Sequence, residues 1–193
     1  QIKTMEREDF IGDLLIEEGR IVEIAGHIEA GSDIPVINGT GYLLTPGLID
    51  GHCHTGILEE GIGAEGNDVN ETGDPITPQH RAIDGINPMA PEFHEALEGG
   101  VTSAMIAPGS LNVIGGQAAI IKTAGRCIDK MIVKAPAAMK IAFGENPKKY
   151  YGGKGKSPAT RMGIAGLLRE TLFEAQNYYN QKKEKKVTKP DFK

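Results

Sequence analysis

The chain has 193 residues, of which 39% are hydrophobic and 24% charged, and its formal net charge is −5. This composition is typical of a globular protein with a buried core and argues against a fibrous or disordered chain. Only two cysteines are present, Cys53 and Cys127, so a disulfide framework is excluded.

Two further classes of partner are excluded by the distribution of apolar and basic residues. No segment has the run of about 18 apolar residues that a membrane span requires, so we expect no membrane partner. Six lysines fall within residues 182–193. Because no aromatic residue interleaves them before Phe192, they indicate a solvated helix end and linker rather than a nucleic-acid site. No signal peptide is visible, and a cytoplasmic location is the default expectation.

Residues 1–45 predict a small β domain. Apolar residues alternate with glycine and charge, as at Leu14, Ile16, Ile21 and Ile24, which is typical of short antiparallel strands. Gly19-Arg20 suits a hairpin turn between the first two of these strands. So short a segment cannot bury both faces of its strands, and we expect it to need partner strands.

Residues 46–54 read Pro-Gly-Leu-Ile-Asp-Gly-His-Cys-His and carry the most specific chemical signal. Residues 43–50 predict a buried strand. Side chains alternate between the faces of a strand, so His52 and His54 should share one face and Cys53 the other. Two imidazoles on one face can bind one divalent metal ion. The competing interpretation is a loop with one histidine bonded to backbone and the other solvated.

The next segment, residues 56–86, is rich in glycine, proline and polar residues and has no helical or strand period. So long an irregular segment in a compact domain usually has a function or is mobile. We therefore expect either a mobile lid that contacts the substrate or a disordered insertion.

Regular elements follow in alternation, which indicates the α/β class. A proline at position 88 or 91 opens a short helix that ends at Gly99-Gly100. The apolar run at residues 101–107 predicts a buried parallel strand. Further strands are predicted at residues 118–121 and 138–143. Ser157-Pro158 then starts an amphipathic helix that reaches residue 179.

The run at residues 46–54 resembles the signature of the amidohydrolase superfamily, metal-dependent hydrolases built on a (β/α)8 barrel. Residues 12–24 look like the small N-terminal β domain of the same family. Asn112-Val113-Ile114-Gly115-Gly116-Gln117 and residues 139–147 are similar to its imidazolonepropionase-like branch. The resemblance covers most of residues 10–180.

The resemblance implies an incomplete fold. A complete barrel takes about 250 residues, so residues 46–193 hold only the first half of a (β/α)8 TIM-type barrel. Residues 1–45 would be part of a small β-sandwich domain. The chain begins with Gln1 rather than methionine, and we expect it to be an internal piece of a longer protein.

The resemblance also implies how the metal site is completed, because a glutamate or a carboxylated lysine from a middle strand serves in this family. Glu145 follows the apolar run at residues 139–143, at the expected C-terminal end of a strand, and is preferred. Lys140 is the competing choice, but it lies near the start of that run. Asp50 is an even number of residues from both histidines, so its side chain should lie on the same face of the strand. It would either orient one histidine without binding the metal itself, or cap the strand end.

Together these features lead to the prediction of a hydrolase. The substrate would be a small molecule with a C–N bond in a cyclic amide, an amidine or a peptide-like group. One or two divalent ions, with zinc as the first choice, would activate the attacking water. In the family the general base comes from a later strand, so we expect it beyond Lys193 and expect this chain to be inactive alone. The alternative is a non-catalytic half-barrel or a metal-binding structural module. A homo-oligomer is expected in either case.

Overall fold

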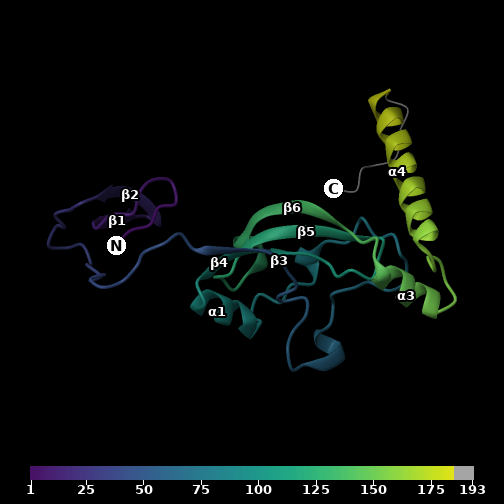
Figure 1. The fold of residues 1–193 in the computed structure, drawn as a ribbon, viewed down its shortest axis with the longest axis horizontal. Coiled ribbons are helices and arrows are strands. Elements are labelled where there is room, and N and C mark those ends of the chain that lie inside the picture. Colours follow the sequence, from purple (N-terminus) through teal and green to yellow (C-terminus); the bar gives the residue numbers. More distant parts are fainter. Residues whose placement is uncertain (185–193) are drawn as a thin grey trace. The chain divides into compact units, whose positions relative to one another are not determined.

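The computed structural model describes residues 1–184 and divides the chain into two compact units, Gln1–Gly47 and Leu48–Lys193 (Figure 1). Each unit is described by itself. Most of the lysine-rich stretch that we interpreted as a helix end and linker lies outside the described residues.

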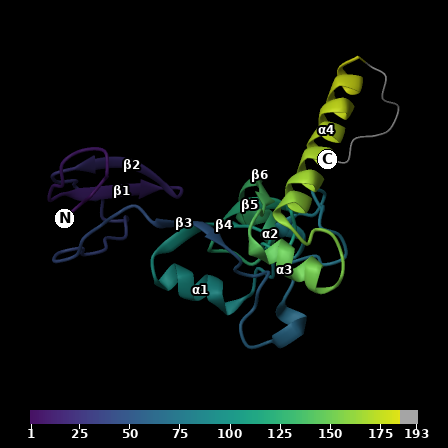
Figure 2. The same ribbon diagram turned by 45° about the vertical axis from the view of Figure 1, so that its right-hand side comes forward.

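The first unit is built on one β-hairpin, whose two arrows lie side by side in Figure 2. Strand β1 (Asp13–Glu17) pairs antiparallel with β2 (Arg20–Ala25). The turn consists of Glu18 and Gly19, whose φ angles of 49° and 74° are both positive, as a type I′ hairpin requires. The predicted hairpin is therefore present, with its turn one residue earlier than Gly19-Arg20.

The apolar residues of this hairpin are not buried in the described structure. Ile16 and Ile21 are 58% and 61% exposed. The hairpin forms a two-stranded sheet of its own, and the other pairings in this unit are isolated bridges from Ile2 to Phe10 and Leu44. The described residues thus form a hairpin with irregular flanks rather than the two packed sheets of a sandwich.

The second unit is a mixed α/β structure around a four-stranded sheet in the order β3-β4-β5-β6. The strands span Leu48–Cys53, Val101–Ile106, Ile114–Lys122 and Ile132–Ile141. Strand β3 pairs parallel with β4, whereas β4 pairs antiparallel with β5 and β5 antiparallel with β6. The parallel arrangement expected of a barrel is therefore limited to the first pair.

The lengths of the connections explain this topology. A parallel connection needs a dozen or more residues and usually a helix. The link from β3 to β4 is long and includes helix α1 (Pro91–Glu98). The link from β4 to β5 is only residues 107–113, and the link to β6 contains only the single-turn helix α2 (Ile128–Met131). Both short links favour antiparallel neighbours.

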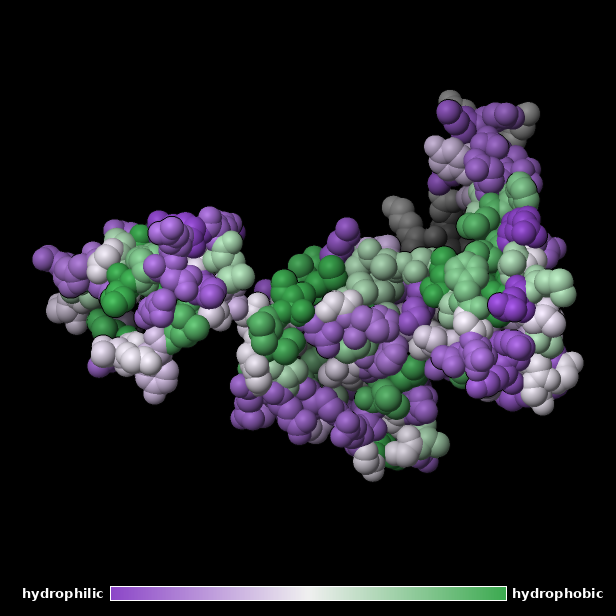
Figure 3. Space-filling view, in the orientation of Figure 1, coloured by the Kyte–Doolittle hydropathy of each residue, from purple (hydrophilic) through white to green (hydrophobic). Residues whose placement is uncertain are grey.

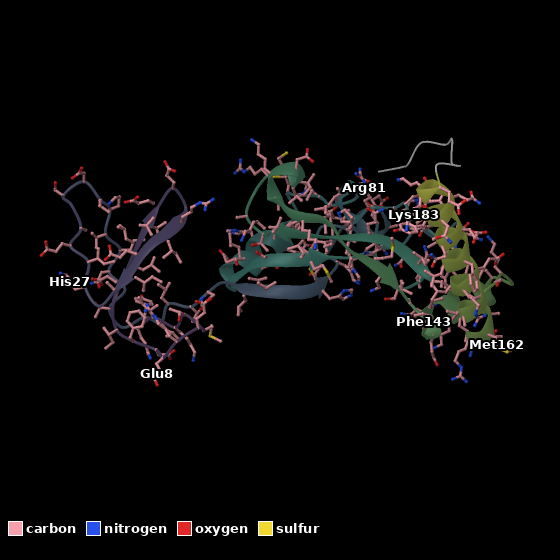
Figure 4. All side chains as sticks on the ribbon, turned by 90° about the horizontal axis from the view of Figure 1, so that it is seen from above. Glu8, His27, Arg81, Phe143, Met162 and Lys183 are labelled. Atoms are coloured by element: carbon pink, nitrogen blue, oxygen red, sulfur yellow. The ribbon has the colours of Figure 1, made fainter. Side chains whose placement is uncertain are left out.

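Two helices follow the sheet. Helix α3 (Glu145–Gly153) comes directly after β6, and α4 (Arg161–Lys183) is the long helix at the yellow end of the ribbon in Figure 1. Helix α4 starts later than predicted, because Thr160 rather than Ser157 is its N-cap and accepts a hydrogen bond from the Gly163 N–H at 3.0 Å. Met162 in the first turn of α4 points outward (Figure 4) and is exposed.

The long segment between β3 and α1 is packed rather than loose. It contains two short 3-10 helices, Gly63–Gly66 and Ala82–Asp84. Its apolar residues Ile57, Val69 and Ile86 are buried in one cluster with Phe93 of α1 and Ile106 of β4. The expectation of a lid or an unstructured insertion is not supported by this packing, because the segment supplies part of the core on which the sheet rests.

We therefore expect slow amide hydrogen exchange at the anchored positions of this segment. The N–H of Asp68 donates to the Ile57 carbonyl at 2.9 Å, and the N–H of Thr77 donates to the Ile114 carbonyl at 2.8 Å. Because opening these bonds exposes buried apolar side chains, their protection should approach that of β4. Exchange at Asp68 and Thr77 as fast as at the exposed Gly73 would contradict this expectation.

Candidate metal-binding site at the end of strand β3

The two histidines of the sequence signature lie side by side where β3 ends. Strand β3 ends at Cys53, and the imidazole centroids of His52 and His54 are 5.2 Å apart with the rings at 77° to each other. The chain then enters the long segment, where the Ile57 N–H donates to the His54 carbonyl at 3.1 Å. The backbone on both sides of the pair is thereby held in place.

His54 is oriented by a main-chain carbonyl. Its Nδ1 lies 2.7 Å from the carbonyl oxygen of Ala107, the residue after β4. Because a carbonyl only accepts, Nδ1 must carry the hydrogen, and the lone pair of the neutral ring is then on Nε2. A buried partner that fixes the tautomer in this way is the usual support of a metal-binding histidine.

His52 faces a lysine from the far edge of the sheet. The Nζ of Lys140, on β6, lies 3.3 Å from His52 Nε2. The His52 side chain is exposed, but partial loss of solvent around its ring is the main cause that lowers its pKa, and the charges of Lys140 and His54 lower it further. Burial also lowers the pKa of Lys140. Both shifts favour neutral side chains, and a neutral imidazole is the form that binds metal.

Gly115 of β5 lies next to this lysine. A Cβ added to Gly115 would lie 3.4 Å from Lys140 Cγ and 3.3 Å from the Gly109 carbonyl oxygen. The distance to Lys140 Cγ is an ordinary van der Waals contact, so the tighter neighbour of Gly115 is the Gly109 carbonyl oxygen.

Glu145, the preferred third ligand in the sequence analysis, does not join the histidines. It is the first residue of α3, it is exposed, and its carboxylate pairs with Lys149 Nζ at 2.6 Å. That pairing lowers the pKa of Glu145. Within residues 1–184, no cluster of three or more His, Cys, Asp or Glu side chains has the geometry to hold a metal ion.

The length of β6 is the physical reason for this difference. The strand begins at Ile132, well before the apolar run used in the sequence analysis, and it ends at Ile141. Lys140 is therefore near the C-terminal end of its strand rather than near the start, and the chain has already turned into α3 at Glu145. Of the two candidates, the structure places Lys140 beside the histidine pair.

Asp50 contacts His52 through the backbone. Its Oδ1 accepts a hydrogen bond from the His52 N–H at 2.9 Å, which corresponds to the strand-end interpretation. Its negative charge raises the pKa of His52, against the larger effect of burial. The sequence had no signal for the partner that does orient a ring, because the Ala107 contact comes from a main-chain carbonyl.

No family model matches the chain. It is 39% identical over 182 residues to an amidohydrolase, tasK, of Hapsidospora irregularis, a match that covers 86% of this chain and 18% of the relative. It is 44% identical over 62 residues to imidazolonepropionase of Vibrio cholerae, which covers 32% of this chain and 15% of the relative.

Among solved structures, an amidohydrolase from Thermotoga maritima matches all of this chain and 50% of its own, with 41% sequence identity and a TM-score of 0.92. The chain thus spans half or less of the length of each of these relatives. No described helix is both long enough and apolar enough to cross a membrane. The resemblance to the amidohydrolase superfamily, including imidazolonepropionase, that the sequence indicates is confirmed.

Proposed function

We propose that this chain is part of a metal-dependent amidohydrolase that hydrolyses a C–N bond of a small molecule with a cyclic amide, amidine or peptide-like group. The observation that carries the proposal is the pair of adjacent imidazoles at the end of β3, with His54 held at Nδ1 by a carbonyl 2.7 Å away. The amidohydrolase relatives support the same class of reaction.

The residues present suit a divalent metal ion, with zinc as the first choice. His52 and His54 would hold it through neutral ring nitrogens. Lys140 replaces Glu145 as the third group, in the carboxylated form that the resemblance implies, because an ammonium group has no lone pair to donate. The lowered pKa of Lys140 favours the neutral amine, the form that can react with carbon dioxide. When bound, such an ion supplies a water of lowered pKa and polarises the scissile carbonyl.

The rest of the proposal concerns the parts of the protein outside this chain. We place the general base there, together with the other half of a (β/α)8 barrel and the strands that would complete a β-sandwich around the hairpin. A second candidate function is a metal-binding or structural module without catalysis, which the adjacent imidazoles of His52 and His54 would also suit. The complete protein is proposed to be a homo-oligomer.

The double variant His52→Ala with His54→Ala should lose its bound metal in the complete protein while remaining folded. Both rings lie at the end of an edge strand and His52 is exposed, so their loss removes ligands without removing core. Metal per chain, measured by plasma mass spectrometry after dialysis, is the readout. His94→Ala is the matched control, because His94 is an exposed helix residue paired with Glu98. Full metal occupancy in the double variant would place the site elsewhere.

The same measurement separates the two candidates for the third group. Lys140→Met should lower metal occupancy strongly, and Glu145→Gln should leave it unchanged, because Glu145 is paired with Lys149 at the surface. If Glu145→Gln instead lost metal and Lys140→Met kept it, Glu145 would be the ligand.

A further inference from the structure

The segment that orients His54 is residues 107–113, the short link between β4 and β5. The Ala107 carbonyl accepts from the His54 ring, and the Ala107 N–H donates to the Cys53 carbonyl at 3.1 Å. Ala107 is thus bonded on both sides to the strand that carries the histidines. Whatever fixes this segment also fixes the acceptor for His54.

The middle of the segment is bonded to the long β3–α1 connection at alternate residues. The Gly109 N–H donates to the Val69 carbonyl at 2.7 Å, and the Leu111 N–H donates to Asn70 Oδ1 at 2.9 Å. The approach is close enough to require glycine, since a Cβ at Gly109 would lie 2.3 Å from Asn70 Nδ2. The segment therefore has little freedom to shift along this surface.

The end of the segment is tied to a buried polar cluster of three side chains, Asn112, Tyr151 and Thr77, each 2% exposed or less. Asn112 Oδ1 accepts from the Tyr151 hydroxyl at 2.6 Å, and Asn112 Nδ2 donates to Thr77 Oγ1 at 3.0 Å and to the Glu71 carbonyl at 2.7 Å. One buried amide thus joins helix α3, the β3–α1 connection and the β4–β5 link.

The cluster is built to be rigid. The hydroxyl of Thr77 donates onward to the Ile114 carbonyl at 2.9 Å, so both polar atoms of the Asn112 side chain have partners that are themselves held. The Tyr151 hydroxyl is the donor in this cluster, and burial raises its pKa to about 12. A fully satisfied buried network of this kind specifies a single arrangement of its backbone.

We propose that Asn112 and Tyr151 are positioning residues for His54: they fix residues 107–113 so that the Ala107 carbonyl holds the histidine with its hydrogen on Nδ1 and its lone pair on Nε2. The inference rests on the proposed function for the role of His54 as a ligand. The tautomer and the backbone that selects it are properties of the chain without metal.

The test uses Tyr151→Phe, which removes one hydroxyl and leaves Asn112 Oδ1 without its donor. Nitrogen-15 NMR of the imidazole at mildly alkaline pH reports the tautomer of His54. The unchanged chain should show the Nδ1–H form. In the variant the ratio of the Nδ1–H to the Nε2–H form should fall by about threefold or more, and the Ala107 amide should exchange about tenfold faster.

Thr123→Val is the matched control, because it also removes one buried hydroxyl, whose partner is the Val101 carbonyl at 2.8 Å at the opposite end of β4. It should lower thermal stability similarly and leave both readouts at His54 and Ala107 unchanged. If Tyr151→Phe behaves like this control, the cluster is structural only and the proposal is overturned.

Asn70→Ala keeps the test decisive if Tyr151→Phe does not fold, because Asn70 is only half-buried and its loss removes the acceptor of Leu111 N–H. It should move the His54 tautomer and the Ala107 exchange in the same direction, and no change in either overturns the proposal. The two proposals can fail separately. If the His52→Ala and His54→Ala variant keeps its metal but the tautomer shift is observed, the proposed function is wrong and the positioning of His54 still holds.

Discussion

The substitution Gly116→Ala, which adds one methyl group, should strongly lower the free energy of unfolding of this chain. A Cβ at this position would lie 2.5 Å from the main-chain carbonyl oxygen of His80, and the φ angle of Gly116 is +122°. The clash is with backbone, and the same His80 carbonyl accepts from the Gln117 N–H at 2.7 Å, so it cannot move without breaking that bond. We expect a loss of about 3 kcal/mol or more in the free energy of unfolding.

Urea denaturation of the variant and the unchanged chain measures this loss. Gly166→Ala is the matched control, since Gly166 lies within α4 and an added Cβ meets nothing within 4 Å. Alanine there should stabilise the helix by about 0.5–1 kcal/mol. Equal unfolding midpoints for Gly116→Ala and the unchanged chain would show that the long connection is not held against β5 as the structure has it.

The tight contact at Gly116 also shows where the sequence was informative and where it was not. Strand alternation predicted that His52 and His54 would lie together, because that relation depends only on local backbone geometry. The glycines at positions 115 and 116 could be read only as part of a family motif. Their nearest neighbours in the fold, the main-chain carbonyls of Gly109 and His80, cannot be read from the local sequence.

Two predictions for the second unit differ from what the structure shows, and for a similar reason. Residues 56–86 have the polar composition of a lid, but Ile57, Val69 and Ile86 are enough to anchor them, and no regular period marks such anchors. Glu145 was preferred because the apolar run at residues 139–143 was used to locate the strand, which placed Glu145 at its C-terminal end. Strand β6 begins earlier, at Ile132, since pairing with β5 rather than local hydrophobicity sets its length.

The topology of the sheet was partly predictable. The link at residues 107–113 is too short for a parallel crossover, so its length alone indicates an antiparallel partner for β4. The family resemblance led instead to the expectation of successive parallel strands, and the pairing of β5 and β6 differs from it.

Produced by itself, this 193-residue chain should show no hydrolase activity above background and should self-associate. Inactivity follows because activation of water needs a general base within hydrogen-bond reach, and the proposed function places that base outside this chain. Activity screens on cyclic amides and amidines test this part. Turnover that depends on His52 would contradict it and would mean that the chain contains its own base.

Association follows from the surface of the second unit. Strands β3 and β6 are the two edges of its sheet, and Ile49 on β3 and Val133 on β6 are 74% and 55% exposed. Hydrophobic surface is visible over this sheet in Figure 3. Open edges that carry apolar side chains favour pairing with another chain. In the Thermotoga maritima relative, the matched half is joined to as much chain again.

Light scattering coupled to size exclusion should therefore report dimers or larger species for the chain alone, in proportions that rise with concentration. The double variant Ile49→Lys with Val133→Lys should shift the distribution toward monomer, because a charged side chain on an edge strand opposes pairing. Met89→Lys is the matched control: Met89 is 59% exposed but lies in the β3–α1 connection, outside the sheet, and its replacement should leave association unchanged. A strictly monomeric unchanged chain at all concentrations would show that the exposed edges do not pair, and equal effects of the edge and control variants would assign the association to general surface hydrophobicity instead.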